Sequence, residues 1–506
     1  MSRSRKLFIS LIFAYGYQLL VIGVGFWLTP FLIKNIGESS FSEWAVISQI
    51  LLYIGIADLG VTSILSRDIA LANGTEQRES RIQEMIRNAI WLNILQMIVL
   101  VPLAILLSQT LISNKPELKS IIMLLVIGNV IFFPFRIYQA ILNGMQDLVF
   151  LSKLQILVWF INTICNVLLV ISGYGLFSLV VGNLLGQLIQ SILLVYQFNR
   201  YKYKLKPKSL KFPGWKPLWK QLVPGLWVSL GSIVQGLYTS EIVLVAALLN
   251  EQAVVIYVCT TKLISIVNNY PYTLNVSSTP IIAEIRGSGN REELIRICRS
   301  LALATMIMSG FLFIVVFSLN QLIVKMWVGE SRYAGDSFTF FTLLAMTIRH
   351  LSFTFSHTLF VFNYNILNTL IGLLDSLLYV IGISIFVQKF GLISIPYCSI
   401  GSVILVTIPI TVYLLAKELK QTRYQILLWI FSWVWKFILI VLILYFLKND
   451  EFHLNMYEEI LLSGLFSLVY ILLQISIFKQ YPLDNYYYRI KNKCLNVVKM
   501  FKKNVD

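Results

Sequence analysis

Long apolar runs separated by short polar segments make up most of the chain. A helix that spans a bilayer needs about 20 mostly apolar residues, because backbone polar groups in hydrocarbon must bond within the segment. The pattern therefore predicts an all-α polytopic membrane protein with about 14 transmembrane helices. The predicted stretches run approximately 8–33, 44–66, 88–112, 120–143, 154–174, 176–198, 221–248, 253–282, 300–324, 335–361, 364–388, 391–416, 425–447 and 459–478.

Composition supports a membrane protein and excludes several other classes. Of the 506 residues, 57% are hydrophobic and only 13% are charged, whereas soluble domains carry about 25% charged residues. The net charge of +17 lies on no visible soluble domain, so we expect no nucleic-acid partner. The five cysteines lack metal-ligand or redox spacing, and no GxxxxGK(S/T) phosphate loop occurs. The sequence therefore indicates no zinc site, no disulfide framework and no ATP motor.

The distribution of basic residues predicts the orientation. Cytoplasmic loops of membrane proteins carry an excess of Lys and Arg. With the basic amino terminus MSRSRK in the cytoplasm, 30 Lys and Arg fall in cytoplasmic segments, 7 in outer segments and 4 inside helices. Both termini are therefore predicted to be cytoplasmic, and the positive charge is explained mainly as a topology signal.

The longest loop and a weak internal repeat predict the domain organisation. A shift of 215 residues places LGVTSILSRDIALANG on LNVSSTPIIAEIRGSG, which aligns the second helix with the eighth. Two parallel six-helix repeats would give this match, and transporters often bind substrate between such repeats. The predicted parts are an N-lobe at 1–198 (helices 1–6), a basic cytoplasmic linker at 199–220, a C-lobe at 221–416 (helices 7–12), helices 13–14 at 417–478 and a basic cytoplasmic tail at 479–506.

Seven ionisable residues lie well inside predicted helices, where each costs about 2.5–3.5 kcal/mol near the centre. Two interpretations are open: the charges pair as interior struts, or they line a polar cavity that handles a charged substrate. The carboxylates are also candidates for binding a coupling H⁺ or Na⁺, or for acting as counter-ions to the bases. The carboxylates are Asp58, Glu241 and Asp375, and the bases are Arg136, Lys262, Arg349 and Lys436.

Arg136 and Arg349 lie at similar depths in helices that the repeat pairs. Counted from the outer ends of their helices, both fall just on the cytoplasmic side of the midplane. The planar guanidinium suits phosphate oxygens, so two arginines converging from opposite lobes would capture a diphosphate from the inner leaflet. The alternative is that one or both pair with Asp58, Asp375 or a backbone carbonyl.

Amide side chains form stripes on two predicted helices. Such faces suit sugar hydroxyls, whereas interhelical hydrogen bonds are the more common use of these residues. Gln155, Asn162 and Asn166 share one face of the fifth helix, and Asn183, Gln187 and Gln190 share one face of the sixth.

Asp58 and Arg67 fall near the end of the second apolar stretch, nine residues apart. In a regular helix nine residues turn through about 900°, so the two side chains would point to opposite faces. Asp58 would then be a buried carboxylate that needs a partner elsewhere. Arg67 would lie at the cytoplasmic membrane surface, where it would meet lipid phosphates or the diphosphate of a substrate.

Several segments, in order along the chain, resemble one family. IADLGVTSILSRDIA is similar to the DLG…R-x-I-A signature of Wzx-type polysaccharide repeat-unit flippases, in the multidrug/oligosaccharidyl-lipid/polysaccharide exporter superfamily. The resemblance covers most of the chain, although Glu241 stands where an aspartate is usual. The other similar segments are AILNGMQD, YTSEIVLVAALL, IYVCTTKL, STPIIAEIRGSGNREEL and KMWVGESRYAG.

This resemblance implies a fold and a function. The fold would be two six-helix lobes around a central cavity, with two appended helices. The protein would flip an undecaprenyl-diphosphate-linked oligosaccharide from the cytoplasmic to the outer leaflet of the bacterial inner membrane by alternating access. The product would be a surface polysaccharide such as O-antigen, lipopolysaccharide or capsule. The protein would not be an enzyme, would need no cofactor beyond a coupling H⁺ or Na⁺, and would work beside a polysaccharide polymerase and a chain-length regulator.

The resemblance also bears on the site residues. Arg67 and Lys262 match basic positions in its motifs, whereas Arg136 and Arg349 match no motif and rest on their depth. The substrate-binding candidates are Arg67, Arg136, Lys262, Arg349 and Lys436, and the sugar-facing candidates are Asn162, Asn166, Asn183 and Gln187.

Alternative functions stay open at this point. One is a cation-coupled multidrug or small-molecule exporter of the same superfamily, which usually has twelve helices rather than fourteen. Another is a membrane polysaccharide polymerase or ligase, which would need a large outer loop with functional arginines or histidines. The longest outer connections here have only about 10–17 residues. A non-transporting scaffold would gain little from buried charge in both halves.

Overall fold

The computed structural model is helical wherever it describes regular structure. Nine of the described helices are long and apolar enough to cross a membrane, or ten if the bent pair Trp215–Tyr238 and Glu241–Leu248 is one span. Every predicted stretch from the fourth onward overlaps one of these spans, and the first three lie partly outside the described residues. The prediction of an all-α polytopic membrane protein is confirmed. The described residues are 20–21, 23–56, 58–72, 78–110, 116–145, 147–288, 290–449 and 456–480.

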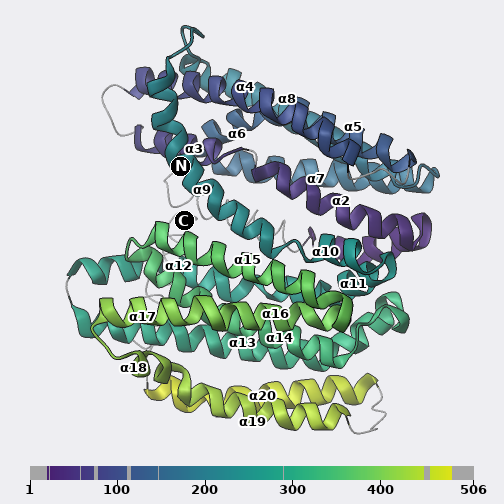
Figure 1. Cartoon of the computed structure of the whole chain (residues 1–506), viewed down its shortest axis with the longest axis vertical. Coiled ribbons are helices and arrows are strands. Elements are labelled where there is room, and N and C mark those ends of the chain that lie inside the picture. The colour runs from purple at the N-terminus through teal and green to yellow at the C-terminus, as the bar shows by residue number, and fades with distance from the viewer. Residues whose placement is uncertain are drawn as a thin grey trace, which may run out of the picture. The chain divides into compact units, whose positions relative to one another are not determined.

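Contacts divide the chain into two compact units, Met1–Val258 and Cys259–Asp506. Residues 23–36 are helical and precede the labelled helices of the first unit. That unit contains α2 (Glu38–Ile56), α3 (Val61–Ala72), α4 (Arg78–Thr110), α5 (Pro116–Phe132), η1 (Phe133–Phe135), α6 (Arg136–Gly144), α7 (Leu148–Ile171), α8 (Phe177–Lys202), η2 (Tyr203–Leu205), α9 (Trp215–Tyr238) and α10 (Glu241–Leu248) (Figure 1). Helix α11 (Glu251–Val267) crosses the boundary. The second unit continues with α12 (Asn269–Ser288), α13 (Arg291–Val328), η3 (Glu330–Arg332), α14 (Asp336–Val361), α15 (Asn365–Phe390), η4 (Gly391–Ile393), α16 (Ser394–Ser402), η5 (Val403–Thr407), α17 (Ile408–Leu419), α18 (Arg423–Leu427), η6 (Leu428–Ile430), α19 (Phe431–Asn449) and α20 (Met456–Gln480).

The two units repeat the same order of neighbours. In the first unit α3 packs on α4 and α6, and α7 packs on α8. In the second unit α12 packs on α13 and α14, and α15 packs on α16. This is the arrangement that the 215-residue repeat predicts, because that shift pairs α3 with α12.

The contact boundary lies inside α11, whereas the sequence-based division lies at the basic linker 199–220. Helix α9, predicted as the first helix of the C-lobe, packs on α2, α3 and α4, and α10 packs on α2. Both therefore belong by contact to the first unit. The division into two mobile lobes at the linker 199–220 stays a prediction.

The second predicted stretch, 44–66, is not one helix. The chain breaks between α2 and α3, where Leu59 (φ 47°) and Gly60 (φ 68°) adopt left-handed backbone conformations. The Oδ2 of Asp58 accepts hydrogen bonds from the N–H (3.0 Å) and the hydroxyl (2.7 Å) of Thr62, and so caps the start of α3. The expectation that Asp58 and Arg67 point to opposite faces assumed one regular helix, and the break between α2 and α3 removes that regular rotation.

Two glycines bring the backbones of α3 and α9 into contact at this break. A Cβ on Gly225 would lie 2.5 Å from the carbonyl oxygen of Leu59 and 3.4 Å from the carbonyl carbon of Gly60. A Cβ on Gly60 would in turn meet the carbonyl group of Gly225, whose carbon it would approach to 2.9 Å. No side chain fits between the helices here, so the packing of α9 on the first unit depends on both glycines.

We expect Gly225→Ala to destabilise the protein. The added methyl group would meet backbone atoms rather than a flexible side chain, and overpacking of this kind costs about 1–3 kcal/mol. Thermal unfolding of the detergent-solubilised protein measures the change. Gly231→Ala in the same helix is the matched control, because no atom lies within 4 Å of its Cβ position and alanine favours a helix over glycine by about 1 kcal/mol. Equal melting temperatures for the two variants would contradict the tight contact.

The last two helices belong to the core of the second unit. Helices α19 and α20 lie side by side and pack on α13 (Figure 1). The buried hydroxyl of Tyr470 accepts a hydrogen bond from Nε1 of Trp433 (2.7 Å) and donates one to the backbone carbonyl of Ile307 (3.0 Å). Gly310 leaves the space for this hydroxyl, since a Cβ there would collide with it.

Candidate functional site

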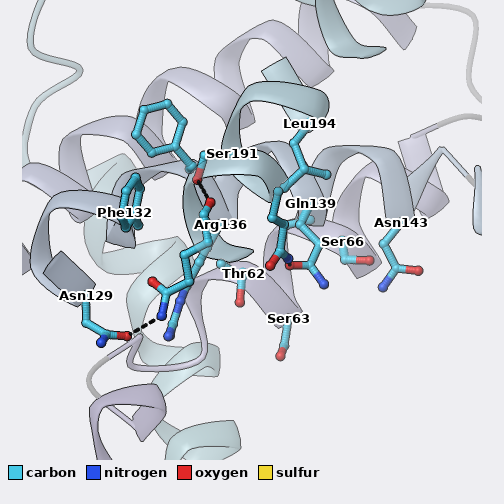
Figure 2. Close-up of a pocket in the computed structure, with 14 residues that line it drawn as sticks. Thr62, Ser63, Ser66, Asn129, Phe132, Arg136, Gln139, Asn143, Ser191 and Leu194 are labelled. Atoms are coloured by element: carbon cyan, nitrogen blue, oxygen red, sulfur yellow. Dashed lines mark hydrogen bonds between the residues drawn. The ribbon is translucent and has the colours of Figure 1, made fainter. Parts of the chain in front are cut away.

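A polar cavity with a volume of about 660 Å³ lies within the first unit (Figure 2). Helices α3, α5, α6 and α8 contribute its walls, and its volume falls in the range of small-molecule sites. Its wall combines hydroxyl groups, amide groups and one cation. The hydroxyl groups come from Thr62, Ser63, Ser66 and Ser191, the amides from Asn129, Gln139, Asn143, Gln187 and Gln190, and the cation from Arg136.

A proline positions the arginine. Pro134 lies in η1, the short 3₁₀ segment that separates α5 from α6. Proline has no N–H to donate to the preceding turn, so the regular α-helical hydrogen bonds are interrupted there. The N–H of Arg136 donates to the carbonyls of Phe133 and Pro134. Arg136 thereby becomes the first residue of α6, and its side chain lies in the wall of the cavity (Figure 2).

Arg136 supplies the positive charge of the cavity. Among the described residues its guanidinium makes no hydrogen bond and no ion pair, and it lies 5.2 Å from the ring centroid of Phe133. Asp58 interacts with it electrostatically, but Oδ2 of Asp58 is held by Thr62. A half-buried cation among neutral polar groups favours an anionic ligand, because a ligand anion supplies the missing charge-assisted hydrogen bonds.

Amide side chains form hydrogen-bonded groups along the cavity. The Nε2 of Gln187 donates to Oδ1 of Asn183 (2.7 Å) and to Oδ1 of Asn129 (3.0 Å). The Nε2 of Gln190 donates to Oε1 of Gln139 (3.3 Å). These bonds connect α8 to the α5–α6 pair and fix the orientation of the amides, which is what specific recognition of polar groups requires.

Three of the lining amides were missed in the sequence analysis. All three lie in the fourth predicted stretch, which also contains Arg136. Counted from Asn129 as i, the residues Arg136, Gln139 and Asn143 follow at i+7, i+10 and i+14. Those spacings describe one face of a helix. The signal was therefore present, as a polar stripe around a buried arginine.

The fifth-helix amides lie elsewhere. The Nδ2 of Asn166 donates to Oδ1 of Asn162 (2.7 Å), and neither residue lines the cavity. Gly182 of α8 packs against both, since a Cβ there would collide with Oδ1 of Asn166 and lie 3.1 Å from the carbonyl oxygen of Asn162. Their visible role is to pack α7 on α8, and their sugar-facing role stays a prediction.

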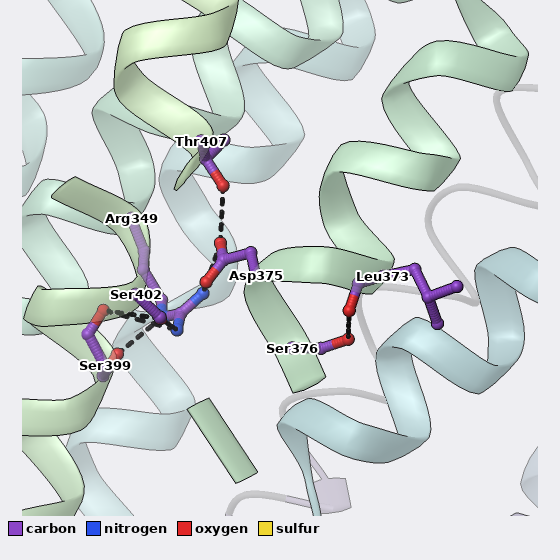
Figure 3. Close-up of polar contacts among 7 residues, drawn as sticks. All are labelled: Arg349, Leu373, Asp375, Ser376, Ser399, Ser402 and Thr407. Atoms are coloured by element: carbon purple, nitrogen blue, oxygen red, sulfur yellow. Dashed lines mark hydrogen bonds and ion pairs between the residues drawn. The ribbon is translucent and has the colours of Figure 1, made fainter. Parts of the chain in front are cut away.

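The second unit holds a buried ion pair where the first unit has its cavity arginine (Figure 3). Nη1 of Arg349 lies 3.7 Å from Oδ2 of Asp375, with the two side chains 20% and 2% exposed. The Nε of Arg349 donates to Oγ of Ser399 (2.6 Å) and its Nη2 to Oγ of Ser402 (3.3 Å). The hydroxyl of Thr407 donates to Oδ2 of Asp375 (2.6 Å). Arg349 thus takes the paired arrangement that the sequence left open as an alternative.

Two further predicted charges have carboxylate or phenol partners. Arg67, with a side chain 58% exposed, donates from Nε (3.0 Å) and Nη2 (2.8 Å) to Oδ1 of its neighbour Asp68. Glu241, the first residue of α10, accepts a hydrogen bond from the hydroxyl of Tyr257 (3.0 Å). Neither Arg67 nor Glu241 lines the cavity.

The two predicted lysines lie in separate places. Lys436 of α19 is buried, and its Nζ donates to the backbone carbonyl of Leu473 on α20 (2.8 Å). Lys262 is half-buried on α11. Neither lines the cavity of the first unit, so of the five predicted substrate-binding bases only Arg136 lies in its wall.

The cavity is suited to a ligand with one anionic end and several hydroxyl groups. Arg136 provides charge, and the first turn of α3, which carries Thr62 and Ser63, adds the partial positive charge of a helix N-terminus. The amides can both donate and accept hydrogen bonds. No combination of nucleophile, base and oxyanion donors was found among the lining residues.

Comparisons with known proteins give the family and the fold. A family model described as "Polysaccharide biosynthesis protein" matches residues 40–332. No curated protein matches the sequence significantly. Among solved structures, the lipid II flippase MurJ in an inward closed conformation has a TM-score of 0.65 at 14% identity, covering 94% of this chain and 99% of that chain.

Multidrug transporters share the fold as well. An inward-facing multidrug resistance MATE family transporter of the MOP superfamily has a TM-score of 0.57 at 14% identity, covering 74% of this chain and 90% of that chain. A MOP superfamily transporter from Pyrococcus furiosus has a TM-score of 0.50 at 14% identity, covering 83% and 95%. This chain therefore belongs to the polysaccharide biosynthesis protein family, and it has the membrane-transporter fold of the MOP superfamily.

Proposed function

We propose that this protein flips a polyprenyl-diphosphate-linked oligosaccharide from the cytoplasmic to the outer leaflet of a bacterial inner membrane. The observation that carries the proposal is Arg136, whose guanidinium makes no hydrogen bond and no ion pair among the described residues, in a cavity of amides and hydroxyls. Such a wall offers charge to a diphosphate and neutral hydrogen-bonding groups to sugars. The family match and the MurJ-like fold support a lipid-linked substrate.

The diphosphate is proposed to bind at Arg136 rather than between two converging arginines. Arg349 already has Asp375 and two serine hydroxyls as partners. Drawing it to a ligand would leave a carboxylate that is 2% exposed without its cation, which is costly in a buried site. The guanidinium of Arg136 makes no hydrogen bond and no ion pair among the described residues, so an anion can form charge-assisted hydrogen bonds there without breaking existing ones.

The sugar end is proposed to contact the amides of the same wall. Gln187, Gln190, Gln139 and Asn143 are all lining residues with neutral polar heads. Hydroxyls on a sugar can replace or extend the bonds that these amides now make with one another. Neutral amides tolerate different sugars, because each can act as donor or acceptor.

A coupling ion, H⁺ or Na⁺, is part of the proposal. Asp58 and Asp375 each have one buried carboxylate oxygen, Oδ1, with no hydrogen-bond partner among the described residues. An acceptor of this kind can take up a proton or a cation to satisfy itself. Glu241, the third predicted carboxylate, is engaged with Tyr257.

Deletion of the gene in its native host tests the proposed function. We expect surface polysaccharide to be lost and lipid-linked single repeat units to accumulate on the cytoplasmic face, because synthesis continues while flipping stops. A leaflet-specific glycan label on right-side-out and inverted vesicles distinguishes the faces. Accumulation on the outer face would instead indicate a polymerase or ligase, a partner class that we propose acts after this protein together with a chain-length regulator.

The exporter alternative makes a different prediction in the same strain. The MATE-like fold is compatible with export of small molecules. In that case the deletion strain would keep normal surface polysaccharide and would change its sensitivity to toxic small molecules. Reintroduction of the intact gene is the control for both outcomes.

A further inference from the structure

One basic and aromatic segment of the first unit has no role in the cavity. Residues 199–220 carry seven Lys and one Arg and no Asp or Glu. Six of these lysines are exposed, and among the described residues their side chains make no ion pair and no hydrogen bond. They are Lys204, Lys206, Lys208, Lys211, Lys216 and Lys220. We call residues 204–220 the lysine–tryptophan segment.

This segment is held in a defined position on α4. Nε2 of Gln83 donates to the backbone carbonyl of Lys204 (2.8 Å), and Nε1 of Trp91 donates to the carbonyl of Leu210 (2.9 Å). The ring of Phe212 packs edge-on against Trp91, with centroids 5.3 Å apart, and against Trp215 at 5.4 Å. The lysines are therefore displayed by an ordered structure, rather than by a free linker.

Large apolar side chains point outward beside the lysines. Trp215 is 61% exposed, Trp219 is 54% exposed and Leu210 is 59% exposed. Trp215 and Trp219 are four residues apart at the start of α9 and share one face of the helix. Lys216 and Lys220 have the same spacing on the neighbouring face. Tryptophan beside lysine is the pattern of a membrane–water interface, where an apolar ring and a charged head are both accommodated.

The position of the segment along the chain agrees with such an interface. It connects the span Phe177–Arg200 to the span that begins at Trp215, so it lies where two helices leave the membrane. Head groups at that level are the groups that the lysines meet first. A positively charged surface with no acidic residue of its own complements anionic lipid, and each lysine near such a surface adds attraction.

We propose that the lysine–tryptophan segment is a binding surface for the head groups of anionic phospholipids. The lysines bind the phosphates, and Trp215 and Trp219 insert between the lipid tails and the head groups. This site is separate from the cavity, because none of its residues lines that cavity. It goes beyond the proposed flipping function and does not depend on it.

Native mass spectrometry of the purified full-length protein, titrated with phosphatidylglycerol or phosphatidylcholine, tests the proposal. We expect the wild-type protein to bind phosphatidylglycerol more tightly than phosphatidylcholine. The double variant Lys211→Gln/Lys216→Gln should lose about 25-fold in affinity for phosphatidylglycerol, or about fivefold per lysine, which corresponds to about 1 kcal/mol each. Raising the salt concentration should weaken the wild-type preference, since exposed charges are screened.

Matched variants distinguish lipid binding at this surface from a general effect of the protein's net charge. Lys34→Gln/Lys389→Gln removes two exposed lysines elsewhere and should keep the wild-type preference. Trp215→Ala/Trp219→Ala should weaken binding of both lipids, because it removes the apolar contact. The proposal would be overturned if the wild-type protein showed no preference for phosphatidylglycerol, or if the two lysine double variants lost equal affinity for it. In either case the lysines would serve only to set the membrane topology.

Discussion

Arg136→Gln is expected to abolish surface polysaccharide while leaving the amount of protein in the membrane unchanged. The substitution removes the one cation from the cavity wall and keeps a polar side chain of similar length. Two charge-assisted hydrogen bonds to a diphosphate contribute about 3 kcal/mol together, so flipping should slow by about 100-fold or more. Polysaccharide immunoblotting and membrane quantification of the tagged protein measure the two quantities.

Two related variants sharpen this test. Arg136→Lys keeps the charge but loses the planar fork, so we expect partial activity. Arg423→Gln makes the same chemical change at an exposed arginine that stacks on Tyr413 in the second unit, and should leave polysaccharide at the wild-type level. Normal polysaccharide in the Arg136→Gln strain would contradict the proposal that the diphosphate binds in this cavity. The gene-deletion phenotype would still test the flipping function separately.

Asp375→Asn is expected to give the second large effect, on stability rather than on recognition. It leaves the guanidinium of Arg349 buried without its counter-charge, although the serine hydroxyls remain. Breaking a buried pair from one side costs about 3 kcal/mol, because the remaining charge is uncompensated. The melting temperature of the detergent-solubilised protein should fall by several degrees, measured as the loss of its monodisperse chromatographic peak on heating.

The double variant distinguishes a strut from a substrate site. Arg349→Met/Asp375→Asn removes both charges, and we expect it to be more stable than Asp375→Asn, since a buried pair replaced on both sides leaves no orphan charge. If Asp375→Asn melts like the wild type, the ion pair does not hold the second unit together. In that event Arg349 would be available to a ligand after all.

Arg136 and Arg349 have different surroundings in the two units. Both lie in helices that the repeat pairs, and the sequence predicts similar depths in the membrane for them. In the first unit a proline at residue 134 starts a new helix at the arginine and places it in a cavity wall. In the second unit α14 continues unbroken through Arg349, and Asp375 lies close enough to neutralise it. An arginine in each of two paired helices thus has a different setting, a cavity wall in the first unit and a buried ion pair in the second.

The sequence by itself determined the fold class. Apolar runs of about 20 residues have one stable solution in hydrocarbon, the helix, because its backbone hydrogen bonds close within the segment. The same reasoning selected the ionisable residues that cannot face lipid, and Arg136 and the Arg349–Asp375 pair were among them. The polar stripe of Asn129, Arg136, Gln139 and Asn143 could also be predicted from the sequence, because the periodicity of one helix is enough to identify it.

Only the tertiary structure decided which charges meet. Arg349 and Asp375 are 26 residues apart on different helices, so their pairing depends on how α14 and α15 are rotated against each other. The break at Asp58 depends likewise on contacts from outside its own helix, where the glycine contact with α9 and the bond from Gln96 Nε2 to the carbonyl of Asp58 (2.8 Å) hold it. Periodicity fixes the face of a helix on which a residue lies, but helix packing fixes what that face meets.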